Sequence, residues 1–188
     1  MNYNYAERYL FEANVRYDGS SRVAPEYRWQ AFPHFQQHGV LVKKMFHLPS
    51  VNNMKVRASW GQLENGAILG LYDYIPMINS GTQLGEKYYF QSQLASKDKK
   101  WEIISTTNLG IDLGMFNNTL SVTADYYWKY NDNMLASLQV PSLIGVTVPN
   151  ANVGKLKTWG WEFEIGYKNR LGNLNYQVSF NLSDSQNR

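Results

Sequence analysis

Residues Leu120–Tyr130 read LSVTADYYWKY, and apolar and polar side chains alternate along them. Every second residue from Leu120 to Tyr130 is apolar or aromatic, whereas the residues between them include Asp125 and Lys129. Because successive side chains of a β-strand point to opposite faces, this period of two predicts a strand with one apolar and one polar face. The stretch therefore indicates an all-β fold built from two-faced strands.

The same alternation recurs along most of the chain. It extends over five further segments: 8–17, 55–61, 109–115, 159–167 and 174–182. In all six predicted strands the charged side chains lie in the polar set, and none lies in the apolar set. A seventh strand is expected near Ala31–Val42, but neither of its two sets is cleanly apolar, so its register stays open.

The composition of the apolar set bears on two interpretations of such strands. A soluble sandwich buries its apolar face against a second sheet, whereas an outer-membrane barrel turns that face to lipid and its polar face to the lumen. Here Tyr and Trp gather near strand ends, as at Tyr9, Tyr17, Trp128 and Trp159, which is typical of aromatic girdles at a lipid–water interface. A charge that faces lipid at the midplane costs roughly 2–4 kcal/mol, which explains a charge-free apolar set. The pattern favours the barrel.

The lengths of the connections support the same interpretation. Segments 116–119 and 169–173 are short, whereas segments 18–30, 63–101 and 131–155 are long and polar. Bacterial outer-membrane barrels have short periplasmic turns and long extracellular loops. We therefore expect segments 116–119 and 169–173 on the periplasmic side.

Composition excludes several other classes of protein. Of the 188 residues, 44% are hydrophobic and 15% are aromatic, too many for a disordered chain. There is no cysteine, which excludes a disulfide framework and a thiolate metal site. No apolar run approaches the roughly 18 residues of a spanning helix. The net charge of +3 comes from scattered basic residues, so no nucleic-acid partner is expected.

Two groups of side chains invite a catalytic or metal-binding interpretation. Glu162 and Glu164 share one strand face with Cα atoms roughly 7 Å apart, a separation that a pair of glycosidase carboxylates tolerates. The simpler interpretation makes them lumen-facing charges that pair with cations on neighbouring strands. His34, His38 and His47 lack the acidic or cysteine neighbours of a metal site. We expect no catalytic residue, no metal and no cofactor.

The long connector between residues 63 and 101 holds the candidate ligand contacts. Tyr88 and Tyr89, next to Phe90, and Trp101 at its end could stack on a glycan. The same rings could instead cover the base of the loop. The candidate substrate contacts are Tyr88, Tyr89 and Trp101.

Several stretches together resemble one family. They are YLFEANVRYDGSSR at 9–22, LPSVNNMKVRASWG at 48–61, TTNLGID at 106–112 and GWEFE at 160–164. Their order along the chain is similar to that in the SusC/RagA family of TonB-linked outer-membrane transporters. The chain departs from the family after Phe35, where Gln36-Gln37-His38 stands in place of an apolar, Trp-containing strand.

The resemblance implies a barrel of about 22 strands with a plug domain in its lumen. Residues 1–188 would then be a partial barrel domain from the C-terminal half, without plug, signal peptide or TonB box. About seven or eight antiparallel, up-and-down strands would form an open, curved sheet with two bare edges. The implied location is the bacterial outer membrane.

The resemblance also implies a function. Members of the family import oligosaccharides, or sometimes peptides, with TonB acting through the plug and a SusD-like surface lipoprotein serving as a lid. The chain would supply barrel wall between outer-membrane lipid on one side and plug and solute on the other, and it would not be an enzyme. Two alternatives stay open, a secreted carbohydrate-binding β-sandwich and a surface adhesin on a small barrel. The sequence does not name the substrate.

Overall fold

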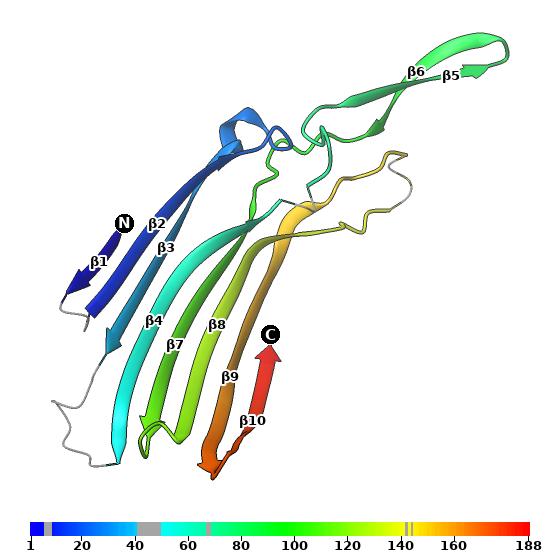
Figure 1. The fold of residues 1–188 in the computed structure, drawn as a ribbon. Helices are drawn as coiled ribbons and strands as arrows, with labels where there is room; N and C mark the ends of the chain where they lie inside the picture. The colour runs from blue at the N-terminus through cyan, green and yellow to red at the C-terminus, as the bar shows by residue number, and fades with distance from the viewer. Residues whose placement is uncertain (6–8, 41–49, 67–68, 142, 144) are drawn as a thin grey trace.

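A computed structural model describes residues 1–5, 9–40, 50–66, 69–141, 143 and 145–188. Within them, one antiparallel sheet holds eight strands in the order β1-β2-β3-β4-β7-β8-β9-β10 (Figure 1). The sheet is curved and open, with β1 at one edge and β10 at the other. The predicted fold class, an open all-β barrel fragment of seven or eight strands, is confirmed.

The strands extend further than the alternating segments that predicted them. The sheet consists of β1 (Asn2–Tyr5), β2 (Tyr9–Gly19), β3 (Trp29–Val40), β4 (Val51–Asn65), β7 (Glu102–Met115), β8 (Leu120–Ala136), β9 (Ala151–Leu171) and β10 (Leu174–Asn187). A separate hairpin, β5 (Met77–Gln83) and β6 (Glu86–Gln93), stands between β4 and β7. A 3-10 turn, η1 (Pro25–Tyr27), precedes β3, and no helix in the described part of the chain is long and apolar enough to cross a membrane.

Strand pairing aligns the apolar residues into rows that cross the sheet. Ala124 of β8 opposes Ile111 of β7 and Phe163 of β9, and Phe163 in turn opposes Leu182 of β10. The residues one step along each strand form the polar rows on the other face. The two faces predicted from the sequence are therefore continuous across four strands.

Charges mark the outer limit of the apolar rows. Lys157 opposes Tyr130 on the apolar face, and its Nζ lies 5.4 Å from the ring centroids of both Tyr130 and Trp159. Asp184 of β10 opposes Trp161 on the same face, so this face also carries one charge inward of Lys157. From Leu120 to Tyr130 the strand rises roughly 34 Å, or about 26 Å along the membrane normal at a tilt near 40°. That height matches the ~25 Å apolar band of an outer-membrane barrel.

The apolar rows have no second layer packed against them. Among the described residues, the buried hydrophobic side chains are Val23, Ala24, Phe32, Leu69 and Trp101, and none of them belongs to the rows. Leu109, in the middle of a central strand, is 46% exposed. A sandwich would bury such residues against a second sheet roughly 10 Å away. The alternative of a secreted carbohydrate-binding β-sandwich is therefore wrong.

Strand β3 settles the register that the sequence left open. Phe35 opposes Ala13 and Trp60 on the apolar face and stacks on Trp60, with ring centroids 5.9 Å apart. Gln37 shares this apolar face, whereas Phe32 is buried on the polar face. These two residues, each on the face of the opposite character, explain why neither set of β3 was cleanly apolar.

Short turns and long connections lie at opposite ends of the sheet (Figure 1). The turn from β7 to β8 has positive φ at Phe116 (51°), Asn117 (57°) and Asn118 (61°), a conformation that Asn tolerates well. Asn52 of β4 braces this turn by accepting a hydrogen bond from the Asn117 backbone N–H at 2.5 Å. The β9–β10 turn lies at the same end, and the β5–β6 hairpin lies at the other. Residues 41–49, between β3 and β4, lie outside the described residues.

The assignment of faces makes a direct prediction for the full-length protein. Phe163 lies near the middle of the apolar rows, so Phe163→Lys should cost about 2–4 kcal/mol and sharply reduce assembly in the outer membrane. The matched control is Asn181→Lys, which adds the same charge opposite Glu164 on the polar face and should assemble normally. Heat-modifiable migration of the folded barrel in isolated outer membranes measures both. Equal assembly of the two variants would contradict the faces.

Candidate functional site

An arginine joins three strands on the polar face. Arg57 of β4 donates from Nε to Asp112 Oδ2 at 2.9 Å and from Nη2 to Asp112 Oδ1 at 3.0 Å. The same Nη2 donates to Asp125 Oδ2 of β8 at 2.9 Å. Planar guanidinium fits two carboxylates in this way because its donors diverge from one rigid fork. We call Arg57, Asp112 and Asp125 the Arg57 clamp.

A glycine makes room for the Arg57 clamp. Gly110 opposes both Arg57 and Asp125 in the sheet, so the guanidinium lies across its bare backbone. A Cβ at Gly110 would overlap Asp125 Oδ1 and lie 2.8 Å from Arg57 Cζ. Gly61 serves the same purpose for His34, whose Cδ2 would lie 2.5 Å from a Cβ there. Glycine is therefore required at Gly110 and Gly61 because long polar side chains lie flat against the backbone there.

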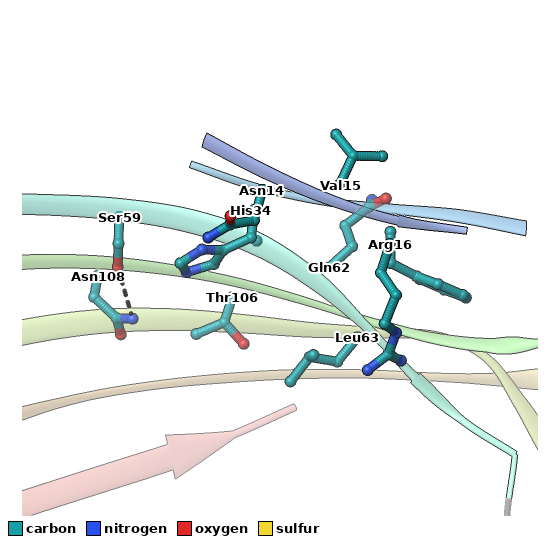
Figure 2. A pocket seen from close by; sticks show the side chains of 11 residues that line it. Asn14, Val15, Arg16, His34, Ser59, Gln62, Leu63, Thr106 and Asn108 are labelled. Atoms are coloured by element: carbon teal, nitrogen blue, oxygen red, sulfur yellow. Dashed lines mark hydrogen bonds between the residues drawn. The ribbon is translucent and has the colours of Figure 1, made fainter. Parts of the chain in front are cut away.

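A hollow of about 510 Å³ lies beside the clamp, toward the outer end of β2, β3, β4 and β7 (Figure 2). The hydrogen-bonding side chains of its lining on the polar face are Asn14, His34, Ser59, Thr106 and Asn108, and Phe32 and Leu63 add apolar surface. Asn108 donates to Ser59 Oγ at 3.2 Å across two strands. Arg16, the charged residue of the lining, is paired with Asp18 and with Glu64. This part of the wall therefore presents amides and hydroxyls rather than net charge.

An acidic stretch follows on the other side of the clamp. Glu162 opposes Asp125 and Ser183, and Glu164 opposes Thr123 and Asn181. Neither glutamate has an ion-pair or hydrogen-bond partner among the residues that the structure describes. The expectation that they pair with cations on neighbouring strands is wrong within the described chain, because the strands on both sides supply an acid, amides and hydroxyls there.

The histidines are dispersed. His34 lies over Gly61, and His38, four residues further along β3, opposes Arg57. His47 lies outside the described residues. In the described part of the chain, no three His, Cys, Asp or Glu side chains converge in a geometry for holding a metal ion.

Trp101 lies in a small core at the outer rim rather than on an open surface. Its side chain is 5% exposed and packs with Val23 and Leu69. Its Nε1 donates to the Tyr27 carbonyl oxygen at 2.7 Å, and Leu135 covers the cluster from β8. We call these five residues the rim cluster. It ties together the β2–β3 connection, the β4–β7 connection and the outer end of β8, so the geometry matches the alternative that this ring covers the base of a loop.

Tyr88 and Tyr89 lie far along the hairpin and face opposite ways. Tyr88 opposes Gly81 and stacks on Phe90, with ring centroids 5.5 Å apart. Tyr89 opposes Ser80 on the other face of the ribbon and is 73% exposed. The structure therefore does not bring the three candidate contacts, Tyr88, Tyr89 and Trp101, together in one pocket.

Sequence patterns did not identify the clamp or the rim cluster. Alternation placed Arg57, Asp112 and Asp125 on polar faces, but the clamp depends on the register between β4, β7 and β8. The run of glycines on polar faces, such as Gly110, was the one usable signal, since it marks where long side chains cross the sheet.

Together these features define the wall of a transmembrane β-barrel. One face of a single curved layer is an apolar band of bilayer height, and the other is hydrogen-bonded and charged. The chain belongs to the TonB-dependent receptor-like, β-barrel family, whose model matches residues 1–188. It is a segment of an outer-membrane barrel wall, and its similarity to SusC and to the RagAB importer agrees with the resemblance to the SusC/RagA family.

Named relatives and solved structures agree with this assignment. The chain is 33% identical over 191 residues to TonB-dependent receptor P39 of Formosa agariphila and covers 18% of it. It is 31% identical over 202 residues to TonB-dependent receptor SusC of Bacteroides thetaiotaomicron and covers 20% of it. All of this chain is matched in both. The RagAB peptide importer in its open-open state shares the fold, with a TM-score of 0.88 at 23% identity over 99% of this chain and 21% of that one. The chain thus spans about a fifth of the length of these relatives.

The close fit over Gly110 predicts a selective effect of adding one methyl group. Gly110→Ala should lower the thermal midpoint of the full-length barrel, because the Arg57 clamp must open to admit the Cβ and each hydrogen bond between charged groups is worth about 1.5–3 kcal/mol. Gly39→Ala is the matched control, since a Cβ at Gly39 meets nothing within 4 Å. Heat modifiability against temperature measures both midpoints. A Gly110→Ala midpoint equal to that of Gly39→Ala would show that the clamp tolerates the methyl group.

Proposed function

We propose that the full-length protein imports oligosaccharides or peptides across the outer membrane, driven by TonB through a plug domain. The observation that carries this proposal is the single-layer wall, with apolar rows on one face and a polar, ion-paired surface on the other. Such a wall separates lipid from an aqueous passage. The named relatives are TonB-dependent receptors rather than enzymes, and one solved structure of this fold is called a peptide importer.

In this proposal the chain forms part of the barrel wall and does not make or break covalent bonds in the solute. Its polar face offers solute a hollow of amides and hydroxyls beside the Arg57 clamp, which holds its own charges in internal pairs. Because the charges are paired with each other and the other groups are amides and hydroxyls, a polar solute can form and break hydrogen bonds with the wall without binding tightly to it. We assign no catalytic residue, metal or cofactor to these residues.

The proposed function needs parts beyond the described wall: further strands, a plug and a surface lipoprotein. We propose that residues 1–188 are a partial barrel domain, and that further strands of the parent protein pair with the free edges of β1 and β10. A plug carries the TonB contact, and a SusD-like surface lipoprotein covers the outer mouth. This assignment draws on the similarity to SusC and to the RagAB peptide importer.

Uptake in cells that carry the full-length protein tests the function. Labelled oligosaccharides and peptides should enter the periplasm, and entry should fall to the level of a transporter deletion when TonB is removed. The protein should also require detergent for extraction from outer membranes. Uptake that persists without TonB, or extraction in buffer alone, would contradict the proposal.

Tyr88 remains a predicted substrate contact. Its ring and that of Phe90 form a continuous aromatic surface over Gly81, of the shape on which a sugar ring packs. Tyr88→Ala should weaken substrate binding by about 1 kcal/mol, or roughly five-fold, as expected for one stacked ring. Tyr88→Phe keeps the ring and should bind as the wild type does. Equal binding by the Ala variant, in direct titration of the detergent-solubilised full-length protein, would remove Tyr88 from the substrate path.

A further inference from the structure

Two cations lie side by side at the outer limit of the apolar rows. The Lys157 N–H donates to the Arg188 carbonyl oxygen at 2.9 Å, and the Arg188 N–H donates to the Lys157 carbonyl oxygen at 2.8 Å. The two residues are therefore directly opposed, with Cα atoms roughly 5.5 Å apart and side chains on one face. Both are exposed. Like charges directly opposite each other destabilise a sheet, so this pair gains stability from a bound anion.

The described chain supplies no counter-ion for this pair. Neither Lys157 nor Arg188 forms an ion pair with a residue that the structure describes. The acids that share their face on β8, β9 and β10 are Asp132 and Asp184. Asp184 lies four residues before Arg188, roughly 13 Å along the strand. Asp132 lies beyond the Lys157 level, beside Lys155, a third cation of the same face. An anion from outside the described chain is therefore the missing partner.

Cations on the apolar face of the sheet occur only at its outer end. The other Lys and Arg side chains of the described sheet strands lie on the polar face: Arg16, Lys55, Arg57, Lys129, Lys168 and Arg170. The apolar face thus has cations toward the outer leaflet and none, among these strands, toward the short turns. Basic residues just outside the hydrocarbon bind anionic lipid headgroups. The asymmetry indicates a headgroup of the outer leaflet.

Two aromatic rings lie next to the cations on the inner side. Lys157 Nζ lies 5.4 Å from the ring centroids of both Tyr130 and Trp159. Aromatic rings beside cations are typical of the lipid–water interface. The apolar rows continue directly inward from these rings. A ligand that fits the whole site therefore has an anionic head and hydrocarbon chains, which neither a free anion nor an acidic protein surface provides.

The tilt of the strands places Asp184 in the headgroup layer as well. On β8 the apolar set continues to Tyr130, whereas on β10 it ends at Leu182, in the row of Phe163. Barrel strands tilt by about 35–45°, so a row at right angles to them is not level in the membrane. The displaced limit gives the direction: the same row lies further out on β10 than on β8. Asp184 therefore lies outside the hydrocarbon, below Arg188.

The groups below the cation pair select the rest of the head. Asp184 opposes Trp161, and Gln186 opposes Trp159. A carboxylate repels phosphate but accepts hydrogen bonds from the hydroxyl and amide groups of a sugar, and a Trp face packs on a sugar ring. A single phosphoethanolamine group is too short to reach from Arg188 to Asp184. The arrangement fits a sugar head with a phosphate on it.

We propose that Lys157 and Arg188 form a binding site for a phosphate of an outer-leaflet glycolipid. Trp159 and Tyr130 lie against its head, and Asp184 and Gln186 accept hydrogen bonds from its sugar. This site lies on the outside of the wall, so the inference goes beyond the proposed import function and does not involve the imported solute. A lipid bound there would fix the height of β9 and β10 in the membrane.

Removal of the two charges tests the site. The probe is lipid A that carries a phosphate at each end of its disaccharide, titrated into the full-length, detergent-solubilised protein and counted by native mass spectrometry. Lys157→Gln with Arg188→Gln should raise the Kd at least about ten-fold, because the phosphate loses its charged hydrogen bonds. Lys157→Arg with Arg188→Lys keeps both charges and should bind as the wild type does. Lys129→Gln with Lys168→Gln removes two exposed charges from the polar face and is the matched control.

Each other outcome has one meaning. A Kd of the double Gln variant within about two-fold of the wild type, or an equal loss in the matched control, overturns the site. Wild-type protein that binds dephosphorylated lipid A or phosphatidylethanolamine as tightly as lipid A overturns recognition of a sugar phosphate, even where the Gln variant fails to assemble. Pyrophosphate that binds as tightly as lipid A overturns the lipid as ligand. Loss of binding to an acidic protein partner with unchanged lipid A binding also overturns it. TonB-dependent uptake that persists throughout leaves the proposed function standing.

Discussion

Lipid contact is the constraint on which the rest of this structure depends. The sheet is one layer thick, and its apolar rows meet no other part of the described chain. In water such a surface would be unstable, whereas in a bilayer it contacts hydrocarbon at no cost, and the strands of a closed barrel satisfy one another's backbone groups. The scarcity of charge in the rows, the aromatic residues near their limits and the position of Lys157 all follow from this contact.

Because the sheet has no buried core, its internal cohesion comes from elsewhere. The polar face is held by strand pairing and by the Arg57 clamp, which spans three strands over Gly110. The hydrophobic core that the chain does build lies at the outer rim, around Trp101. That placement gives the connections a firm base while leaving the lumen polar, which a passage for hydrophilic solutes requires.

The alternation of apolar and polar residues alone predicted the class of fold, because a charged side chain is costly at a lipid-facing position of a strand and is therefore rare there. It predicted both faces of β8 and the short turn after Met115, and the family resemblance supplied the outer membrane. It failed where a residue takes the opposite face, as Phe32 and Gln37 do in β3. The clamp escaped prediction because it needs inter-strand register. The β5–β6 hairpin escaped prediction because residues 77–93 do not alternate regularly between apolar and polar.

Accessibility along β8 tests the lipid contact most directly. Single cysteines introduced at successive positions from Val122 to Trp128 in a cysteine-free full-length protein can carry a spin label in the native outer membrane. We predict that collision with lipid-dissolved oxygen peaks at the even-numbered positions, and that collision with a water-soluble nickel chelate peaks at the odd-numbered ones. Uniform accessibility, or the opposite alternation, would contradict the central claim that the apolar rows face hydrocarbon.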